Sequence, residues 1–358
     1  MSNLNKLTIT QIKEYAKKNN LKCPSGLKKD QLIEYLKGLL NDKKNQEEQP
    51  ITFLTQKLQP RYPTPNENWL NDLHEKGYCI VQIPNWDPAF TDIFFEFLES
   101  CCEDFRSDDI STWKPSNLPI LLHGILKHYF GHTEFQWKIR ELCAPIFAEI
   151  FECDVNDLLC SFDGGCFLSS TNKNEYFKQW IHNDQQRIYR DFCCVQGIVN
   201  FVNNDFEDGG LVLVEGSHTI FNEYMNKHPS SGIVWEPADM SDKLLSERNL
   251  IKICAPAGHL ILFDSRTFHC NVSPFENSKM KFRMCTYISM QPRNRATQKE
   301  LEKRVKLYEK GRMSGHWTYG SWFKETAEHP RTYGNQNNKP QIIQIAELND
   351  LRKRLIGY

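Results

Sequence analysis

Three side chains in the second half of the chain have the types that bind a metal ion. His182 and Asp184 stand two positions apart in WIHNDQ, and His269 follows later in FHCNV. Alternate residues of a β-strand face the same way, so His182 and Asp184 can point into one cavity. Two histidines and a carboxylate on one face of an octahedral ion leave three positions open, an arrangement that suits Fe(II). The alternative is a polar loop that contains His and Asp by chance.

A second polar group is expected on the strands that follow. Arg283 lies between Phe282 and Met284, and a buried arginine needs an anion. We expect it to pair in forked fashion with the far carboxylate of a dicarboxylic co-substrate. In the run CCVQGIVN, Gln196 and Asn200 share one face, where each needs a polar partner.

The elements that must position these residues change character near Leu158. Before this residue, the patterns predict a strand in GYCIVQIP and helices in DPAFTDIFFEFLESCCEDF and QWKIRELCAPIFAEIF, the second broken at Pro145. After it come short alternating runs separated by turn-rich segments such as NNDFEDGG and PFENSK. Helices followed by many short strands predict an α+β fold, with an antiparallel barrel or sandwich and helices packed on one side.

The motifs around the candidate residues follow a recognisable order. His-x-Asp is followed by GGLVLVEGSH, then by GHLILFDSRTFH, then by an arginine fourteen residues beyond His269. This combination resembles the phytanoyl-CoA dioxygenase-like branch of the Fe(II)/2-oxoglutarate oxygenases, over roughly Trp69 to Met290. The resemblance implies a double-stranded β-helix, the jelly roll of that superfamily, with Fe(II), 2-oxoglutarate and O2 as cofactors.

Residue by residue, the resemblance assigns His182, Asp184 and His269 to the metal and Arg283 to the side carboxylate of 2-oxoglutarate. Asn271 stands where better-known relatives often carry Ser. The further expected 2-oxoglutarate contacts are Gln196, Asn200 and Asn271. His218, in the signature GSH, is expected to be structural. Because Asp184 is retained, the resemblance implies hydroxylation of a C–H bond rather than halogenation.

Other histidines are weaker candidates for ligands. His259 lies in the turn PAGH and is expected to be a turn residue. His123, His128 and His132 have spacings that imitate a zinc site, but no Cys or acidic partner completes it. We expect surface or substrate-side roles for these three. The sequence has no HExxH, phosphate-binding glycine loop or GxSxG, so hydrolase and kinase functions lack support.

Composition bounds the class of protein. The chain has 358 residues, of which 40% are hydrophobic, and no run of 18 apolar residues. MSNLNKLTIT does not resemble a signal peptide. Thirteen cysteines are scattered without a CxxC pair, which favours free buried thiols in a reducing, intracellular compartment.

The N-terminal segment differs from the rest in charge. Residues 1–45 carry ten Lys and four acidic residues, whereas the whole chain has a net charge of −1. Two short amphipathic helices are predicted in LTITQIKEYAKKNN, where Thr8 and Gln11 form a capping box, and in LKKDQLIEYLKGLL. The segment resembles a SAP domain, which implies binding of duplex DNA or chromatin through phosphate contacts, expected at Lys18, Lys28 and Lys29. A protein-docking helix pair is the alternative.

These patterns predict three parts: the two-helix module at 1–45, a flexible linker at 46–68, and the oxygenase domain with a C-terminal helical extension at 69–358. The extension contains GHWTYGSW, for which ordinary packing is preferred over a role at the barrel mouth. The leading hypothesis is a hydroxylase of a DNA- or chromatin-associated base or protein, in the nucleus or another DNA-containing compartment. A small-molecule hydroxylase and a non-catalytic DNA-binding adaptor are the alternatives. Gln185, Gln186, Arg187 and Arg190 are expected to face the substrate.

Overall fold

The computed structural model describes residues 7–18, 28–36, 57–63, 67–122, 125–126, 129–169, 180–228, 236–275, 278–280, 282–320, 323–326 and 345–358. The chain divides into two units, Met1–Lys57 and Leu58–Tyr358, which we call the head and the body. Most of the predicted linker, together with Leu21, the Gly26-Leu27 turn, His123 and His128, lies outside the described residues.

The first of two sheets in the body carries the candidate metal ligands. Its strand order is β1-β11-β9-β13-β7-β10, and all its described pairings are antiparallel except that of β1 with β11. The strands are β1 (Leu58–Arg61), β11 (Leu250–Ile253), β9 (Gly210–Val214), β13 (His269–Val272), β7 (His182–Asn183) and β10 (Glu236–Pro237). Strand β1 therefore belongs to the body, although it falls within the range predicted as linker.

The second sheet carries Arg283. Its strand order is β2-β12-β8-β14-β6-β4-β3, with β5 paired to the far part of β14. The strands are β2 (Tyr78–Gln82), β12 (His259–Asp264), β8 (Val195–Asn200), β14 (Phe282–Pro292), β6 (Gly165–Ser169), β4 (Ile125–Leu126), β3 (Ile120–Leu122) and β5 (Leu158–Cys160). From β6 to β9 and again from β11 to β14, successive strands alternate between the two sheets. This winding agrees with the expected double-stranded β-helix.

Alternation along each strand separates the two hydrophobic cores. On β14, Cys285 and Tyr287 join the cluster between the sheets, whereas Met284 and Ile288 join the cluster under the helices. Because alternate side chains leave opposite faces of a strand, Arg283 faces the interior between the sheets. Both faces of the second sheet are covered, so its strands are apolar nearly throughout. The expected α+β class, with a β-sandwich core, is confirmed.

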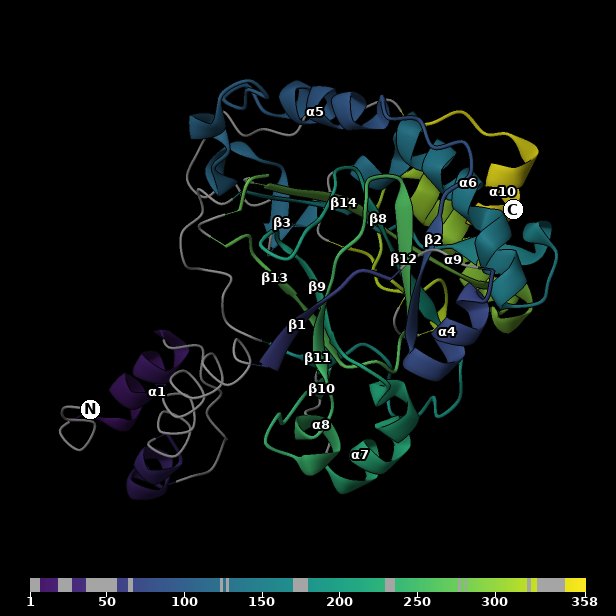
Figure 1. Ribbon diagram of the computed structural model, residues 1–358. Helices are drawn as coiled ribbons and strands as arrows, with labels where there is room; N and C mark the ends of the chain where they lie inside the picture. Colours follow the sequence, from purple (N-terminus) through teal and green to yellow (C-terminus); the bar gives the residue numbers. More distant parts are fainter. Residues whose placement is uncertain are drawn as a thin grey trace. The chain divides into compact units, whose positions relative to one another are not determined.

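Helices cover the outer face of the second sheet and one end of the body (Figure 1). They are α4 (Trp69–Lys76), α5 (Phe90–Cys101), α6 (Glu134–Ile150), α7 (Phe221–Lys227), α8 (Lys243–Ser246), α9 (Gln298–Glu309) and α10 (Asp350–Ile356). The expected break at Pro145 is wrong, because α6 continues through that residue. Proline removes one backbone donor, but Ala144, Ile146 and Phe147 are buried around it, and this packing offsets the lost bond.

The C-terminal extension is tied to the sandwich on both sides of His316. The Ser314 amide donates to the Phe162 carbonyl at 2.9 Å, and the Phe162 amide donates to Ser314 Oγ at 3.0 Å. Beyond His316, the Thr318 amide donates to Gln291 Oε1 at 3.0 Å. Trp317 between them is 1% exposed. The backbone at His316 is therefore fixed against the sheet rather than laid loosely over it.

Two helical segments make up the described part of the head. They are α1 (Ile9–Lys18) and residues 29–36, and their buried apolar side chains form one small cluster, which includes Ile12, Leu32 and Leu36. The predicted capping box is present, because the Thr8 amide donates to Gln11 Oε1 at 2.9 Å and the Gln11 amide donates to Thr8 Oγ1 at 3.3 Å. The expected helix pair is thus present within the described residues.

His132 is a core residue, so the expected surface or substrate-side role is wrong for it. The side chain is fully buried against the rings of Trp137 and Phe162, and Nε2 lies 2.7 Å from the Arg312 carbonyl oxygen. Burial lowers the pKa of His132 to about 3, and the Arg312 carbonyl raises it only in part.

The buried His132 should make the free energy of unfolding depend on pH. The pKa of an unfolded imidazole is about 6.5, so the unfolded chain binds the proton more tightly and stability is lost as pH falls through the window from about 6.5 to about 3. His132 alone should remove about 2 kcal/mol of unfolding free energy between pH 7 and pH 5. Urea unfolding at both pH values should show a smaller loss for His132→Gln than for wild type. Equal losses would contradict a neutral buried His132.

The twelve cysteines that the structure describes are all free, and most are buried. Burial raises the pKa of most of these thiols, for example that of Cys270 to about 12, which keeps them protonated and unreactive. The expectation of free buried thiols is confirmed for these residues. Within the described part of the chain, no helix has the length and apolar character needed to cross a bilayer.

Candidate metal centre

The ends of two neighbouring strands bring the three predicted ligands together. His182 begins β7, Asp184 follows β7 directly, and His269 begins β13. His182 and His269 are direct partners across the antiparallel pair, so their side chains leave the same face of the sheet. Among the described residues, these form the one cluster of three or more His, Cys, Asp or Glu whose ligand atoms lie within 4.8 Å of one another.

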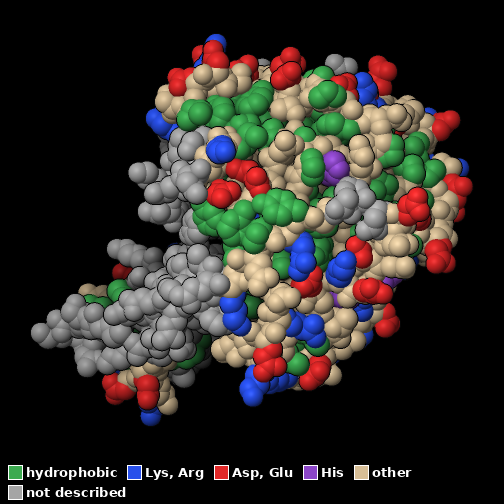
Figure 2. Space-filling model, viewed as in Figure 1, with side chains coloured by type: hydrophobic (Ala, Val, Ile, Leu, Met, Phe, Trp, Pro, Cys, Tyr) green, Lys and Arg blue, Asp and Glu red, His purple; other side chains and the backbone are tan. Residues whose placement is uncertain are grey.

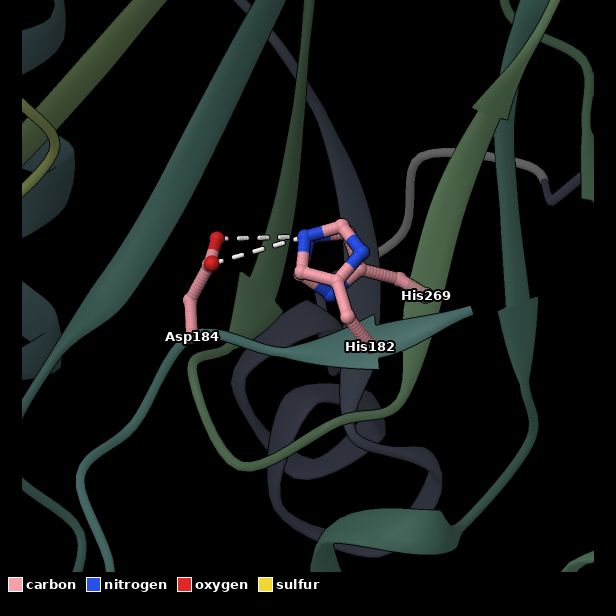
Figure 3. Close-up of side chains that lie close together, drawn as sticks. All are labelled: His182, Asp184 and His269. Atoms are coloured by element: carbon pink, nitrogen blue, oxygen red, sulfur yellow. Dashed lines mark ion pairs between the residues drawn. The ribbon is translucent and has the colours of Figure 1, made fainter. Parts of the chain in front are cut away.

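The ring nitrogens and the carboxylate are oriented toward each other (Figure 3). His182 Nε2 lies 3.4 Å from Asp184 Oδ1, and His269 Nε2 lies 3.5 Å from Asp184 Oδ2. The outer nitrogens are engaged by backbone: His182 Nδ1 is 2.9 Å from the Trp180 carbonyl oxygen, and His269 Nδ1 is 3.0 Å from that of Thr267. A carbonyl can only accept, so each Nδ1 carries a proton, and each Nε2 would present its lone pair to a bound metal ion.

Burial and charge suit this cluster to a cation. The three residues are 5 to 6% exposed, and the Trp180 ring stacks on the His182 ring with 4.4 Å between the ring centres, which limits access of water. Burial raises the pKa of Asp184, but the two imidazoles lower it further, so the pKa lies well below its usual range. Burial and the neighbouring His182 lower the pKa of His269. An ionised carboxylate and neutral imidazoles are the forms that bind metals.

Arg283 lies across the sandwich from this cluster. Two adjoining cavities share Ile125, Trp180, Asn271 and Tyr287; one also contains the triad, and the other also contains Arg283. Arg283 is 2% exposed, its Nη1 donates to Asn271 Oδ1 at 2.9 Å, and its buried Nε has no hydrogen-bond partner among the described residues. A buried guanidinium with an unsatisfied donor fits an incoming carboxylate.

The donor set therefore fits the implied cofactors. His182, Asp184 and His269 would hold Fe(II) on one face, and Arg283 would hold the far carboxylate of 2-oxoglutarate. Among the other predicted contacts, Asn271 lies in both cavities and bonds Arg283. Gln196 Nε2 donates to Asp184 Oδ2 at 3.0 Å, and Asn200 Nδ2 donates to the Ala255 carbonyl at 3.3 Å. Asn200 lines neither cavity.

His316 is a site residue that the sequence did not reveal. It lines the triad cavity, with Nε2 at 3.9 Å from Asp184 Oδ2. Its Nδ1 is hydrogen-bonded to Oδ2 of Asp163, whose side chain is 1% exposed. Asp163 and His316 lie far apart in the chain, and no periodic pattern links them. The available signal was the mixture of aromatic residues and histidine in GHWTYG, which we expected to serve packing alone.

Gln185, Gln186, Arg187 and Arg190 were expected to face the substrate, but none of them lines either of these two cavities. Gln185 Nε2 donates to the Tyr189 carbonyl at 2.7 Å, and Arg187 Nε pairs with Glu236 at 3.1 Å. These side chains hold the loop after β7 in place. His218 Nε2 lies 2.8 Å from the His74 carbonyl oxygen, as a structural residue would.

The sequence matches no protein-family model. It is 29% identical over 292 residues to "Ava biosynthesis cluster protein O" of Aspergillus versicolor, and this match covers 74% of this chain and 91% of that protein. It is 21% identical over 251 residues to "Putative phytanoyl-CoA dioxygenase" of Dictyostelium discoideum, and this match covers 55% of this chain and 66% of that protein. Among solved structures, the epimerase SnoN in complex with Fe3+, alpha-ketoglutarate and nogalamycin RO is similar at a TM-score of 0.46 and 14% identity, over 63% of this chain and 83% of that one.

The second relative carries the name of the enzyme class that the motifs predict, and the buried triad has the ligands which that class requires. The chain is therefore similar in sequence to a protein named as a phytanoyl-CoA dioxygenase, and its buried triad could hold a metal ion.

Proposed function

We propose that the protein hydroxylates a C–H bond of a small organic molecule in a reaction that consumes 2-oxoglutarate and O2. The observation that carries the reaction type is the buried His182-Asp184-His269 cluster, with Arg283 in the adjoining cavity. Bound iron would supply the activation of O2 that amino-acid side chains cannot provide. The chain's own residues ligate, orient the co-substrate and exclude water.

The proposed substrate class rests on a relative, and the proposed binding position rests on the two cavities. The Aspergillus protein is named for a biosynthesis cluster and matches over most of its length, which favours a small molecule. Arg283 lies in one cavity and His316 in the other, so the substrate is proposed to bind at the His316 end. Asp163 fixes the ring through Nδ1, and Nε2 lies 3.9 Å from Asp184 Oδ2 in the lining of the triad cavity.

Two measurements test this proposal. Anaerobic addition of Fe(II) and 2-oxoglutarate should produce a weak visible charge-transfer band in wild type and none in His182→Ala. Metabolite pools incubated with the aerobic enzyme should then yield a product heavier by one oxygen atom, with succinate formed in step. No band and no succinate would instead favour the non-catalytic adaptor.

A DNA- or chromatin-associated substrate is the second candidate, favoured by the head. On the face drawn in Figure 2, Lys and Arg of the body are interspersed with Asp and Glu, so the proposal rests on the head. Lys28 is exposed at the start of the second helical segment and Lys29 follows it, whereas the Lys18 side chain lies outside the described part. We propose that this SAP-like module binds phosphates of duplex DNA and localises the enzyme in a DNA-containing compartment.

Removing residues 1–45 should abolish DNA binding. The double variant Lys28→Ala/Lys29→Ala should bind DNA more weakly, and the slope of log affinity against log salt concentration should fall by the contribution of about two phosphate contacts. Fluorescence anisotropy with a labelled duplex at several salt concentrations measures both. A control variant, Lys353→Ala, changes an exposed lysine of α10 and should bind as wild type. Unchanged affinity after truncation would rule out the SAP-like role. The same screen for oxygenated products, run on DNA and nuclear protein, decides between the two substrate classes.

A further inference from the structure

The two oxygens of Asp184 have different surroundings. Oδ1 lies 3.4 Å from His182 Nε2. Oδ2 lies 3.5 Å from His269 Nε2, accepts a hydrogen bond from Gln196 Nε2 at 3.0 Å, and lies 3.9 Å from His316 Nε2. At 3.9 Å His316 Nε2 is beyond hydrogen-bond distance of Oδ2, whereas Gln196 Nε2 donates to this oxygen.

Gln196 reaches Asp184 from the opposite sheet, and its backbone is fixed. It lies in the interior strand β8, directly opposite Phe263 of β12 and Ser289 of β14. The side chain is 5% exposed and lines the triad cavity. Its Nε2 donates to Asp184 Oδ2 at 3.0 Å, so the amide NH2 faces the carboxylate. The bond is charge-assisted, which makes it stronger than a bond between neutral groups.

A carboxylate can bind a metal ion through one oxygen or through both. With two histidines and one carboxylate oxygen, an octahedral ion keeps three open positions, two for a chelating co-substrate and one for O2. A second carboxylate oxygen would take one of these three. We propose that Gln196 is a positioning residue that engages Oδ2 and so keeps Asp184 a one-oxygen ligand. This inference rests on the proposed function and adds a role for Gln196 other than the expected contact with 2-oxoglutarate.

The test uses the full chain with Fe(II) and 2-oxoglutarate under anaerobic conditions, and nitric oxide as a probe of the last open position. Gln196→Met keeps the length of the side chain and removes the amide. It should retain the charge-transfer band of the wild type but bind nitric oxide about tenfold more weakly, as measured by electron paramagnetic resonance. Gln196→Asn, which is one methylene shorter, should show the same loss and serves if the methionine variant does not fold.

The matched control is Gln136→Met. Gln136 is also buried, its Oε1 accepts from the Thr286 hydroxyl at 2.6 Å, and it lines neither cavity. It should bind nitric oxide as wild type. Equal nitric oxide affinity in Gln196→Met and Gln136→Met would overturn the inference. So would loss of iron binding in Gln196→Met, because Gln196 would then only hold Asp184 in place. A wild type without the band would instead refute the proposed function, and this inference with it.

Discussion

Replacing His182 by alanine should weaken Fe(II) binding by more than about 100-fold and abolish the conversion of 2-oxoglutarate to succinate. Loss of residues that only orient metal ligands already costs about 10- to 100-fold, and His182 is one of three proposed ligands. The variant also leaves the Asp184 carboxylate buried with one imidazole neighbour fewer. Isothermal titration with Co(II), which does not oxidise during the experiment, measures the affinity directly.

The control for this variant is His259→Ala. His259 begins β12, its Nδ1 lies 3.0 Å from the Ala257 carbonyl oxygen, and it lines neither cavity. Metal affinity should therefore be unchanged in His259→Ala. If both alanine variants bound the metal equally well, the cluster at β7 and β13 would not be the metal centre.

Replacing Arg283 by leucine should raise the dissociation constant for 2-oxoglutarate about 10- to 100-fold while leaving metal affinity unchanged. Hydrogen bonds to a charged group contribute about 1.5 to 3 kcal/mol each, and Arg283 contacts no metal ligand in the described hydrogen bonds. Titration of the charge-transfer band with 2-oxoglutarate measures this constant.

Arg283→Lys separates charge from geometry at the same position. Lysine keeps the positive charge but lacks the forked donor pair of arginine. The dissociation constant of Arg283→Lys for 2-oxoglutarate should therefore lie between those of wild type and Arg283→Leu. If Arg283→Leu bound 2-oxoglutarate as tightly as wild type, the co-substrate would lie elsewhere. A parallel loss of metal affinity would mean that the leucine had disturbed the sheet rather than one contact.

The period of two along the strands was the most informative feature of the sequence. It placed Gln196 on a face where a polar partner is needed, which Asp184 provides, and it set His182 and Asp184 side by side. Strand alternation is local, so it can be recognised without knowledge of the tertiary fold. The α+β class followed from the same pattern.

The partners of these polar residues were not predictable in this way. Gln196 meets Asp184 across the sandwich, and His316 meets Asp163 from the C-terminal extension. Such contacts depend on how two sheets and a distant segment pack, and a single sequence carries no periodic signal for that packing. Gln185 and Arg187 lie outside both cavities for the same reason: Gln185 bonds the backbone of its own loop, and Arg187 pairs with Glu236.

The division of the site between two sheets links ligand binding to cohesion of the body. The proposed metal ligands belong to β7 and β13 or directly follow β7, whereas Arg283 belongs to β14 of the opposing sheet. A co-substrate that touches both acts as a crosslink between the layers, present in the folded chain and lost on unfolding. Metal and 2-oxoglutarate together should therefore raise the melting temperature by more than the sum of the rises that each ligand causes alone. Arg283→Leu should remove this excess.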